Sequence, residues 1–183
     1  MSGVVASNIR IYNATPAQDE KIRRAIRLIM AVVNGPKFKD EVIKFGYERR
    51  YSKGFFWNKK YYTEWVEHFT STTESNQEVY DRIMTGETED DESNDVEFDF
   101  GVNVLQGSHG GVIGYTTPGS DRTNTYAWVI RDYADYELAG HFFHEYVHRA
   151  HYDHANASDH NSAPYALGYI MERLAKELLQ QAA

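Results

Sequence analysis

The sequence predicts an α+β domain, because strand-like alternation and helical periodicity occupy different parts of the chain. A strand and a long helix come first, several strands occupy the middle, and two helices end the chain. With 183 residues, 42% of them hydrophobic and only four of them proline, the chain can bury a substantial core. We therefore expect a single domain over residues 1–183, built on a small mixed sheet with an N-terminal and a C-terminal helix.

The N-terminal segment predicts a strand followed by a helix. Residues 4–12 alternate enough to form a strand. Thr15-Pro16-Ala17-Gln18 then combines a threonine cap, a proline at the first helical position and a glutamine three residues after the cap. Apolar residues continue at helical spacing to about Val33, and Asn34-Gly35-Pro36 predicts the end of this helix.

The middle of the chain predicts one short helix and three strands. Residues 75–84 read as a helix that ends at Gly86. Residues 96–105 alternate strongly between apolar and other side chains, which is typical of a strand. Residues 111–116 and 125–130 predict two further strands, separated by the turn-rich segment TPGSDRTN.

Two helices are expected to complete the domain. The first runs from about Asp135 to Ala150 and contains most of the histidines. The second runs from Tyr165 to about Gln180 and is bounded by Pro164, a residue that favours the beginning of a helix.

Residues 47–62 mix five basic and seven aromatic side chains. Aromatic rings beside basic groups can stack nucleic-acid bases, but a twisted hairpin or the wall of a substrate cleft has the same composition. Because the stretch is short and the protein is acidic, a structural or cleft-lining role is the favoured interpretation.

The charge balance restricts the partners. The formal net charge is −8, and residues 87–95 contribute six negative charges. We interpret that stretch as a solvated loop; a calcium site is the alternative, although the glycine and ligand spacing of a known calcium loop are missing. An acidic balance argues against nucleic acid as a partner, since such binding depends on clustered Lys and Arg.

No apolar run approaches the length needed to cross a bilayer, so we expect no membrane partner. The N-terminal residues MSGVVASNIRIYN lack the basic start and long apolar segment of a secretory signal. We therefore expect a cytoplasmic monomer, with export by another route left open.

The segment HFFHEYVHRAHYDH, residues 141–154, holds five of the eight histidines of the chain. Within it, His144 and His148 form an HExxH pattern, which places both imidazoles on one face of a helix. Glu145 lies beside that face, where it can poise a water molecule. The chain has no cysteine, so a metal must be held by His, Asp or Glu, and Zn²⁺ suits such imidazole ligands.

A third histidine requires the helix to end. In a continuous helix His151 would lie about 10 Å from His144 along the axis, and His154 about 15 Å, whereas zinc–nitrogen bonds are about 2 Å long. A third ligand from this segment therefore requires the chain to turn back soon after His148.

The spacing in HEYVHRAHYDH resembles that of the metzincin zinc proteases, HExxHxxGxxH. The resemblance extends over about residues 96–171, where GGVIGYTTPG and TYAWVI are similar to an edge strand and connection before the active-site helix, and SAPYALGYIM to the turn beneath the metal. It implies a metzincin-like catalytic domain that binds Zn²⁺ and hydrolyses a peptide or protein substrate. It also implies that His144, His148 and His154 are the zinc ligands, that Glu145 is the general base, and that Tyr165 donates a hydrogen bond to an oxyanion.

Two residues depart from the metzincin pattern. His151 stands where those enzymes have glycine, so it must adopt the positive φ of the turn, which His tolerates better than most residues. Pro164 stands near the place of the expected methionine, and Met171 comes later.

Several other assignments stay open at this point. Asp159, as in the aspartate-zincins, or Glu172 is the alternative third ligand. His151 or His160 as a fourth ligand would make a closed zinc-stabilised binding module instead of an enzyme. His141 is expected to be packed beside the ligands, Asp153 either to anchor a ligating imidazole or to be exposed, and Tyr165 alternatively to cap the last helix.

Overall fold

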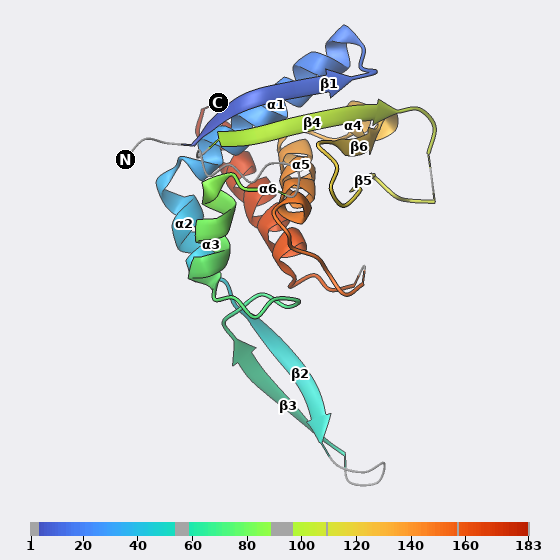
Figure 1. Cartoon of the computed structure of the whole chain (residues 1–183). Helices are drawn as coiled ribbons and strands as arrows, with labels where there is room; N and C mark the ends of the chain where they lie inside the picture. Colours follow the sequence, from blue (N-terminus) through green and yellow to red (C-terminus); the bar gives the residue numbers. More distant parts are fainter. Residues whose placement is uncertain (1–3, 54–58, 89–96, 109, 157, 183) are drawn as a thin grey trace.

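The computed structural model describes residues 4–53, 59–88, 97–108, 110–156 and 158–182 (Figure 1). These residues form six helices, a four-stranded sheet and a two-stranded sheet, which confirms the expected α+β class. None of the described helices is both long enough and apolar enough to cross a bilayer.

The larger sheet is mixed, as expected, and has the strand order β1-β4-β6-β5. Strand β1 (Val5–Tyr12) is parallel to β4 (Glu97–Leu105), and β4 is parallel to β6 (Thr123–Tyr126). The short strand β5 (Gly114–Thr116) is antiparallel to β6 and forms one edge of the sheet. The predicted strand over 111–116 is shorter in the structure and begins at Gly114; its expected first residue, Gly111, has a φ of 85°, outside the extended range.

Helix α1 (Pro16–Val33) begins as the sequence predicts. The Thr15 side chain accepts a hydrogen bond from the Gln18 backbone N–H, and the Gln18 side chain accepts one from the Thr15 N–H. The buried face of α1 packs against α5 (Asp135–Arg149) and α6 (Ala163–Gln181), the two helices that were expected near the C-terminus. This packing places α5 in the centre of the molecule, with β4 crossing above it (Figure 1).

Two helices were not predicted. Pro36 does not only follow the end of α1; it occupies the first turn of α2 (Pro36–Ile43), where its missing N–H costs nothing. The predicted strand over 125–130 is wrong after Tyr126, because α4 (Ala127–Asp132) begins there. Residues 126–130 form a continuous apolar or aromatic run, and periodicity does not separate a buried strand from a helix in so short a run. Its Val129 and Ile130 are buried in the core as α4 contacts α1.

The aromatic and basic stretch after α2 forms a hairpin of β2 (Tyr47–Lys53) and β3 (Lys60–Val66), which was one of its interpretations. The hairpin projects away from the helices (Figure 1). Helix α3 (Asn76–Thr85) follows it and ends at Gly86, as expected, with a φ of 82°. Most of the acidic stretch 87–95, and with it the calcium alternative, lies outside the described residues.

Helices α5 and α6 approach each other closely at two glycines. A Cβ atom on Gly140 would lie 2.8 Å from the Cβ of Glu172, and a Cβ on Gly168 would lie 3.1 Å from the Cβ of His144. Because neither position has room for a side chain, the first turns of α6 lie directly against the histidine-bearing face of α5.

Candidate metal centre

Helix α5 presents His144 and His148 on one face. The two residues are four positions apart, and their Nε2 atoms are separated by 3.2 Å. On the opposite side, α5 is anchored in the core by apolar side chains that are almost completely buried, namely Leu138, Phe142, Phe143, Tyr146 and Val147. Core packing therefore determines how the helix is rotated and where the two imidazoles point.

The end of α5 is a turn in which His151 has a φ of 70°, the conformation that the sequence required of it. The N–H of His151 donates to the carbonyl of His148, and the N–H of Tyr152 donates to the carbonyl of Val147. These two bonds form a Schellman motif, which commonly ends helices with a left-handed residue. Tyr152, the residue after the left-handed position, is buried in the core and anchors the turn there.

The reversed chain brings His154 back to the helix. One possible ligand atom from each of His144, His148 and His154 lies within 4.8 Å of the others. The His154 ring centroid lies 5.0 Å from that of His148 and 5.9 Å from that of His144. Among the residues that the structure describes, this is the only group of three or more His, Asp or Glu side chains with such a separation.

Backbone carbonyls determine the tautomers of the two helical imidazoles. The Nδ1 of His148 lies 2.9 Å from the Tyr152 carbonyl and must donate to it, since a carbonyl only accepts. His144 hydrogen-bonds to the backbone of Pro164, which has a carbonyl but no N–H. With Nδ1 protonated in both neutral rings, the two Nε2 lone pairs face each other across 3.2 Å. Two facing acceptors repel unless a cation lies between them.

The electrostatics also keep these rings neutral. Burial, followed by the neighbouring imidazole of His148, lowers the pKa of His144 to about 3. Burial, and next the neighbouring His154, lowers the pKa of His148. A neutral imidazole is the form that ligates a metal, so both rings are ready to bind one at neutral pH without losing a proton.

The third ring is similarly short of protein partners. The Nδ1 atom of His154 is buried, yet within the described ranges it has no hydrogen-bond partner. A buried polar nitrogen normally finds a partner, because leaving it unpaired costs about 1–3 kcal/mol. A cation bound through this Nδ1 would offset that cost, so the residues present fit a metal site.

Glu145 is buried on the same stretch of α5, next to the edge strand. Its carboxylate accepts hydrogen bonds from the backbone N–H and the hydroxyl of Thr116 in β5. Burial raises the pKa of Glu145 to about 7, and the two Thr116 hydrogen bonds oppose this rise. A carboxylate with that pKa can both accept and return a proton near neutral pH.

His141 has a structural position, as expected. Its Nε2 lies 3.0 Å from the hydroxyl of Thr125, and its Nδ1 lies 3.9 Å from a carboxylate oxygen of Glu145. Burial lowers the pKa of His141 to about 4, so the ring is neutral. Gly114 lies so close that a Cβ atom there would be 2.7 Å from the His141 ring. His141 therefore packs α5 against β5 and β6 and supports Glu145.

The alternative ligands lie elsewhere. Asp159 accepts hydrogen bonds from the hydroxyls of Thr70 and Ser71, the second at 2.8 Å, and thereby ties its loop to the segment after β3. His151 and His160 are exposed, and Glu172 lies on α6 near Gly140. None of these four alternatives belongs to the cluster formed by the described residues. Asp153 is 90% exposed, but its Oδ1 lies 3.1 Å from the His148 Nδ1, so it fits both of its interpretations.

Tyr165 lies in the first turns of α6, against the cluster. Its ring centroid is 4.7 Å from that of His144 and 4.8 Å from that of His154. Burial, followed by the charges of Tyr169 and Glu145, raises the pKa of Tyr165. The phenol therefore keeps its proton at neutral pH and can donate a hydrogen bond beside the imidazoles.

A cavity of about 850 Å³ opens over these residues. It is lined by the three clustered histidines, by Glu145 and Tyr165, and by residues 110–116 at the edge of the sheet. A cavity of this size accommodates a ligand as large as a short peptide segment.

Sequence reasoning missed three groups that support the site: the Pro164 carbonyl, the Tyr152 carbonyl and the Thr116 donors. A backbone carbonyl is present at every position, so the sequence does not indicate which ones will accept a hydrogen bond at the site. These groups reach α5 only through the tertiary fold, namely the turn after α5, the packing of α6 and the register of β5. Comparisons with protein families, curated proteins and solved structures gave no match to this chain.

Proposed function

We propose that this protein is a zinc-dependent metallopeptidase of the metzincin-like kind. The observation that carries the proposal is the convergence of His144, His148 and His154, with possible ligand atoms within 4.8 Å of one another, beside the buried carboxylate of Glu145. Three imidazoles are a ligand set typical of catalytic zinc, which retains one open position for water or substrate.

Zinc held by this set would polarise a substrate carbonyl and lower the pKa of a water molecule toward about 7. The carbonyls of Pro164 and Tyr152 would hold the His144 and His148 rings in the ligating tautomer. The turn at His151 would supply the third ligand.

Glu145 would act as the general base. Its raised pKa matches a group that takes a proton from the attacking water and returns it to the leaving amine. Thr116 would orient the carboxylate, because two hydrogen bonds from one residue restrict its rotation. The buried His141, whose Nδ1 lies 3.9 Å from a carboxylate oxygen of Glu145, would pack beside it and limit its movement.

The edge strand β5 suggests how a peptide would be bound. In the sheet β5 pairs with β6 alone, and residues 110–116 line the cavity. An extended substrate could add to this edge through backbone hydrogen bonds, which would make binding depend little on side chains. Tyr165, protonated and beside the ligands, would donate to the oxyanion that develops on the scissile carbonyl.

The test compares the wild type with Glu145→Gln on an unstructured protein substrate, with and without added zinc. Removing the general base should lower the rate at least about 100-fold while the zinc content stays the same. Glu20→Gln, an exposed glutamate on α1, is the matched control and should keep full activity. Equal hydrolysis by wild type and Glu145→Gln would rule out the proposed mechanism.

A further inference from the structure

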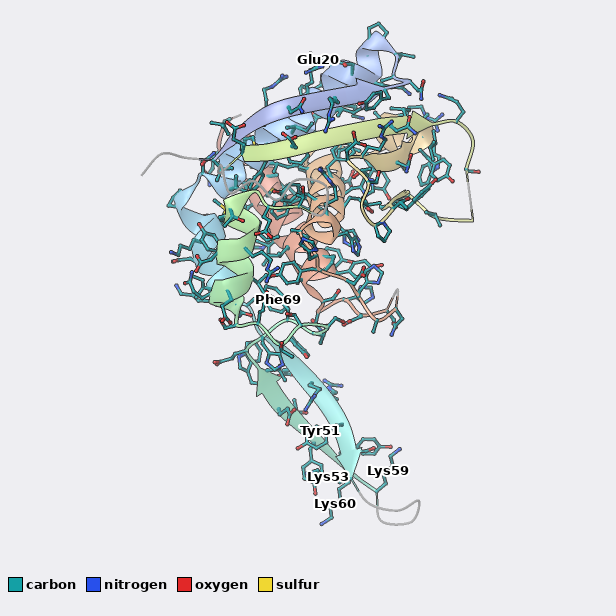
Figure 2. All side chains as sticks on the ribbon, viewed as in Figure 1. Glu20, Tyr51, Lys53, Lys59, Lys60 and Phe69 are labelled. Carbon is teal, nitrogen blue, oxygen red and sulfur yellow. The ribbon has the colours of Figure 1, made fainter. Side chains whose placement is uncertain are left out.

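The β2–β3 hairpin contributes little to the core, so its presence in the fold calls for a functional explanation. Of the residues in its two strands, only Val66 is buried. The hairpin leaves the helical body near Phe69, which stacks on Phe45 at a centroid distance of 4.5 Å, and its far end carries Lys53, Lys59 and Lys60 (Figure 2). An isolated two-stranded ribbon is only marginally stable in water, so such an arm is not explained by folding alone.

The far end of the hairpin concentrates positive charge. Lys53 lies directly opposite Lys60 in the register of the two strands, and Lys59 precedes Lys60. All three are exposed, and within the described ranges no carboxylate lies within ion-pair distance of them. Like charges opposite each other destabilise a β ribbon, so this arrangement is unfavourable until an anionic partner neutralises it.

Tyrosines lie among these lysines. Tyr61 is 78% exposed, and the Lys59 ammonium lies 5.6 Å from the centre of its ring. Tyr51 and Tyr62 stack across the strands at 5.6 Å, with the Lys53 ammonium 5.5 Å from the Tyr51 ring. Exposed tyrosine and lysine side chains together suit the boundary between an apolar phase and a charged, aqueous one, such as the headgroup region of a bilayer.

The charge of the hairpin is opposite to that of the rest of the chain. Residues 47–66 contain five Lys or Arg and two Glu, a net charge of +3 in a chain of −8, so the remainder carries −11. Each seven-residue strand spans about 20 Å at about 3.3 Å per residue, which exceeds the Debye length of about 8 Å at physiological salt. The arm therefore keeps the acidic body outside the range at which an anionic surface would repel it.

The distribution of charge along the hairpin favours a flat anionic surface over a nucleic-acid strand as its binding partner. Along the ribbon, Arg49 forms an ion pair with Glu64, and Glu48 lies opposite Trp65. Arg50, opposite Thr63, is the remaining stem cation, so the described strands carry no continuous basic track. Single-stranded nucleic acid is bound along such a track, whereas a bilayer touches only the end of a projecting arm.

We propose that the β2–β3 hairpin docks the protein on an anionic lipid bilayer through Lys53, Lys59, Lys60 and the adjacent tyrosines. This contact is peripheral, and it revises the expectation from the sequence that the chain has no membrane partner. It does not depend on the metal site.

The experiment is flotation of the full-length chain with vesicles of phosphatidylcholine containing one third phosphatidylglycerol, and with vesicles of pure phosphatidylcholine. The wild type should bind the anionic vesicles and not the neutral ones. Each lysine near an anionic surface contributes about fivefold to partitioning, so Lys53→Gln/Lys59→Gln/Lys60→Gln should bind about 100-fold more weakly.

The matched control is Lys39→Gln/Lys44→Gln/Lys176→Gln, which removes the same charge from exposed positions on α2, its end and α6. It should bind like the wild type, and circular dichroism should show both triple variants folded. The proposal is wrong if the wild type ignores anionic vesicles or if the hairpin variant binds as well as the control. It is also wrong if a single-stranded oligonucleotide binds the hairpin more tightly than the vesicles do.

Discussion

The hydroxyl of Tyr152 donates a hydrogen bond to the carboxylate of Glu74, a residue 78 positions earlier in the chain. Glu74 lies just before α3 and also accepts from Arg82 in the last turn of that helix, at 2.5 Å, so its carboxylate is tied to α3. The carbonyl of the same Tyr152 accepts from the His148 Nδ1. One buried tyrosine therefore links the turn after α5, an imidazole of the candidate metal centre and a distant part of the fold.

Tyr152→Phe should weaken zinc binding about tenfold, because residues that orient ligands typically contribute 10–100-fold to metal affinity. The substitution removes the bond to Glu74 and frees the turn, while the ring still fills the core. A competition titration against a chromophoric chelator measures the effect. Tyr80→Phe, which removes a hydroxyl from α3 away from the cluster, should leave the affinity unchanged; equal affinities in all three proteins would contradict this role of Tyr152.

His151→Gly should stabilise the protein by about 1 kcal/mol, because glycine adopts a φ of 70° without the steric penalty of a Cβ atom. His151→Val should destabilise it, since β-branched residues tolerate positive φ least. Urea unfolding in the presence of a chelator provides both free energies without a contribution from metal. If valine were as stable as glycine there, the turn would not have the described conformation.

Acid should destabilise the zinc-free protein partly through His141. The pKa of this buried ring is about 4 in the folded protein, against about 6.5 when unfolded, so below pH 6.5 the unfolded chain binds the extra proton. The contribution of His141 to the free energy of unfolding, about 3 kcal/mol, is present above pH 6.5 and is lost as the pH falls to 4. Glu145, whose pKa is raised, contributes with the opposite sign, so the measurement compares two proteins.

The comparison is between the wild type and His141→Gln, which cannot titrate. The unfolding free energy of the wild type should fall more steeply between pH 6.5 and 4 than that of the variant. Parallel pH profiles would mean that the His141 ring takes up a proton in the folded protein as readily as in the unfolded chain.

Tyr165→Phe should lower kcat by about 100-fold and change KM little, as expected for a donor that acts on the developing oxyanion. Zinc affinity should stay at the wild-type value, because Tyr165 is not one of the proposed ligands and its ring, which packs against His144 and His154, is kept in phenylalanine. Steady-state kinetics and the chelator titration separate these effects. A variant with normal kcat would assign Tyr165 to packing alone.

The elements that sequence reasoning located are those governed by local rules. The Thr15 cap with Gln18 and the left-handed Gly86 each depend on residues within one turn of a helix. Helix α4 was missed because its apolar run suits either a strand or a helix, and its contact with α1 decided between them. Pro36 was interpreted only as a stop because a proline that ends one helix and begins another leaves the same signal.

The same division applies to the candidate site. The positions of His144, His148 and Glu145 follow from helical spacing, and the left-handed His151 follows from the need to bring His154 back. The partners of these residues come from other segments: Pro164 from α6, Thr116 from β5 and Glu74 from before α3. Their arrival depends on tertiary contacts, including the close approach at Gly168, which no local pattern encodes.

The most direct test of the central claim is the zinc affinity of three proteins: wild type, His154→Ala and His151→Gly. We expect one tightly bound zinc per chain in the wild type and in His151→Gly, since the latter keeps the turn and position 151 lies outside the cluster. We expect a large loss of affinity in His154→Ala, because one of three imidazole ligands is gone. Wild-type affinity in His154→Ala, or zinc lost only in His151→Gly, would contradict the proposed ligand set.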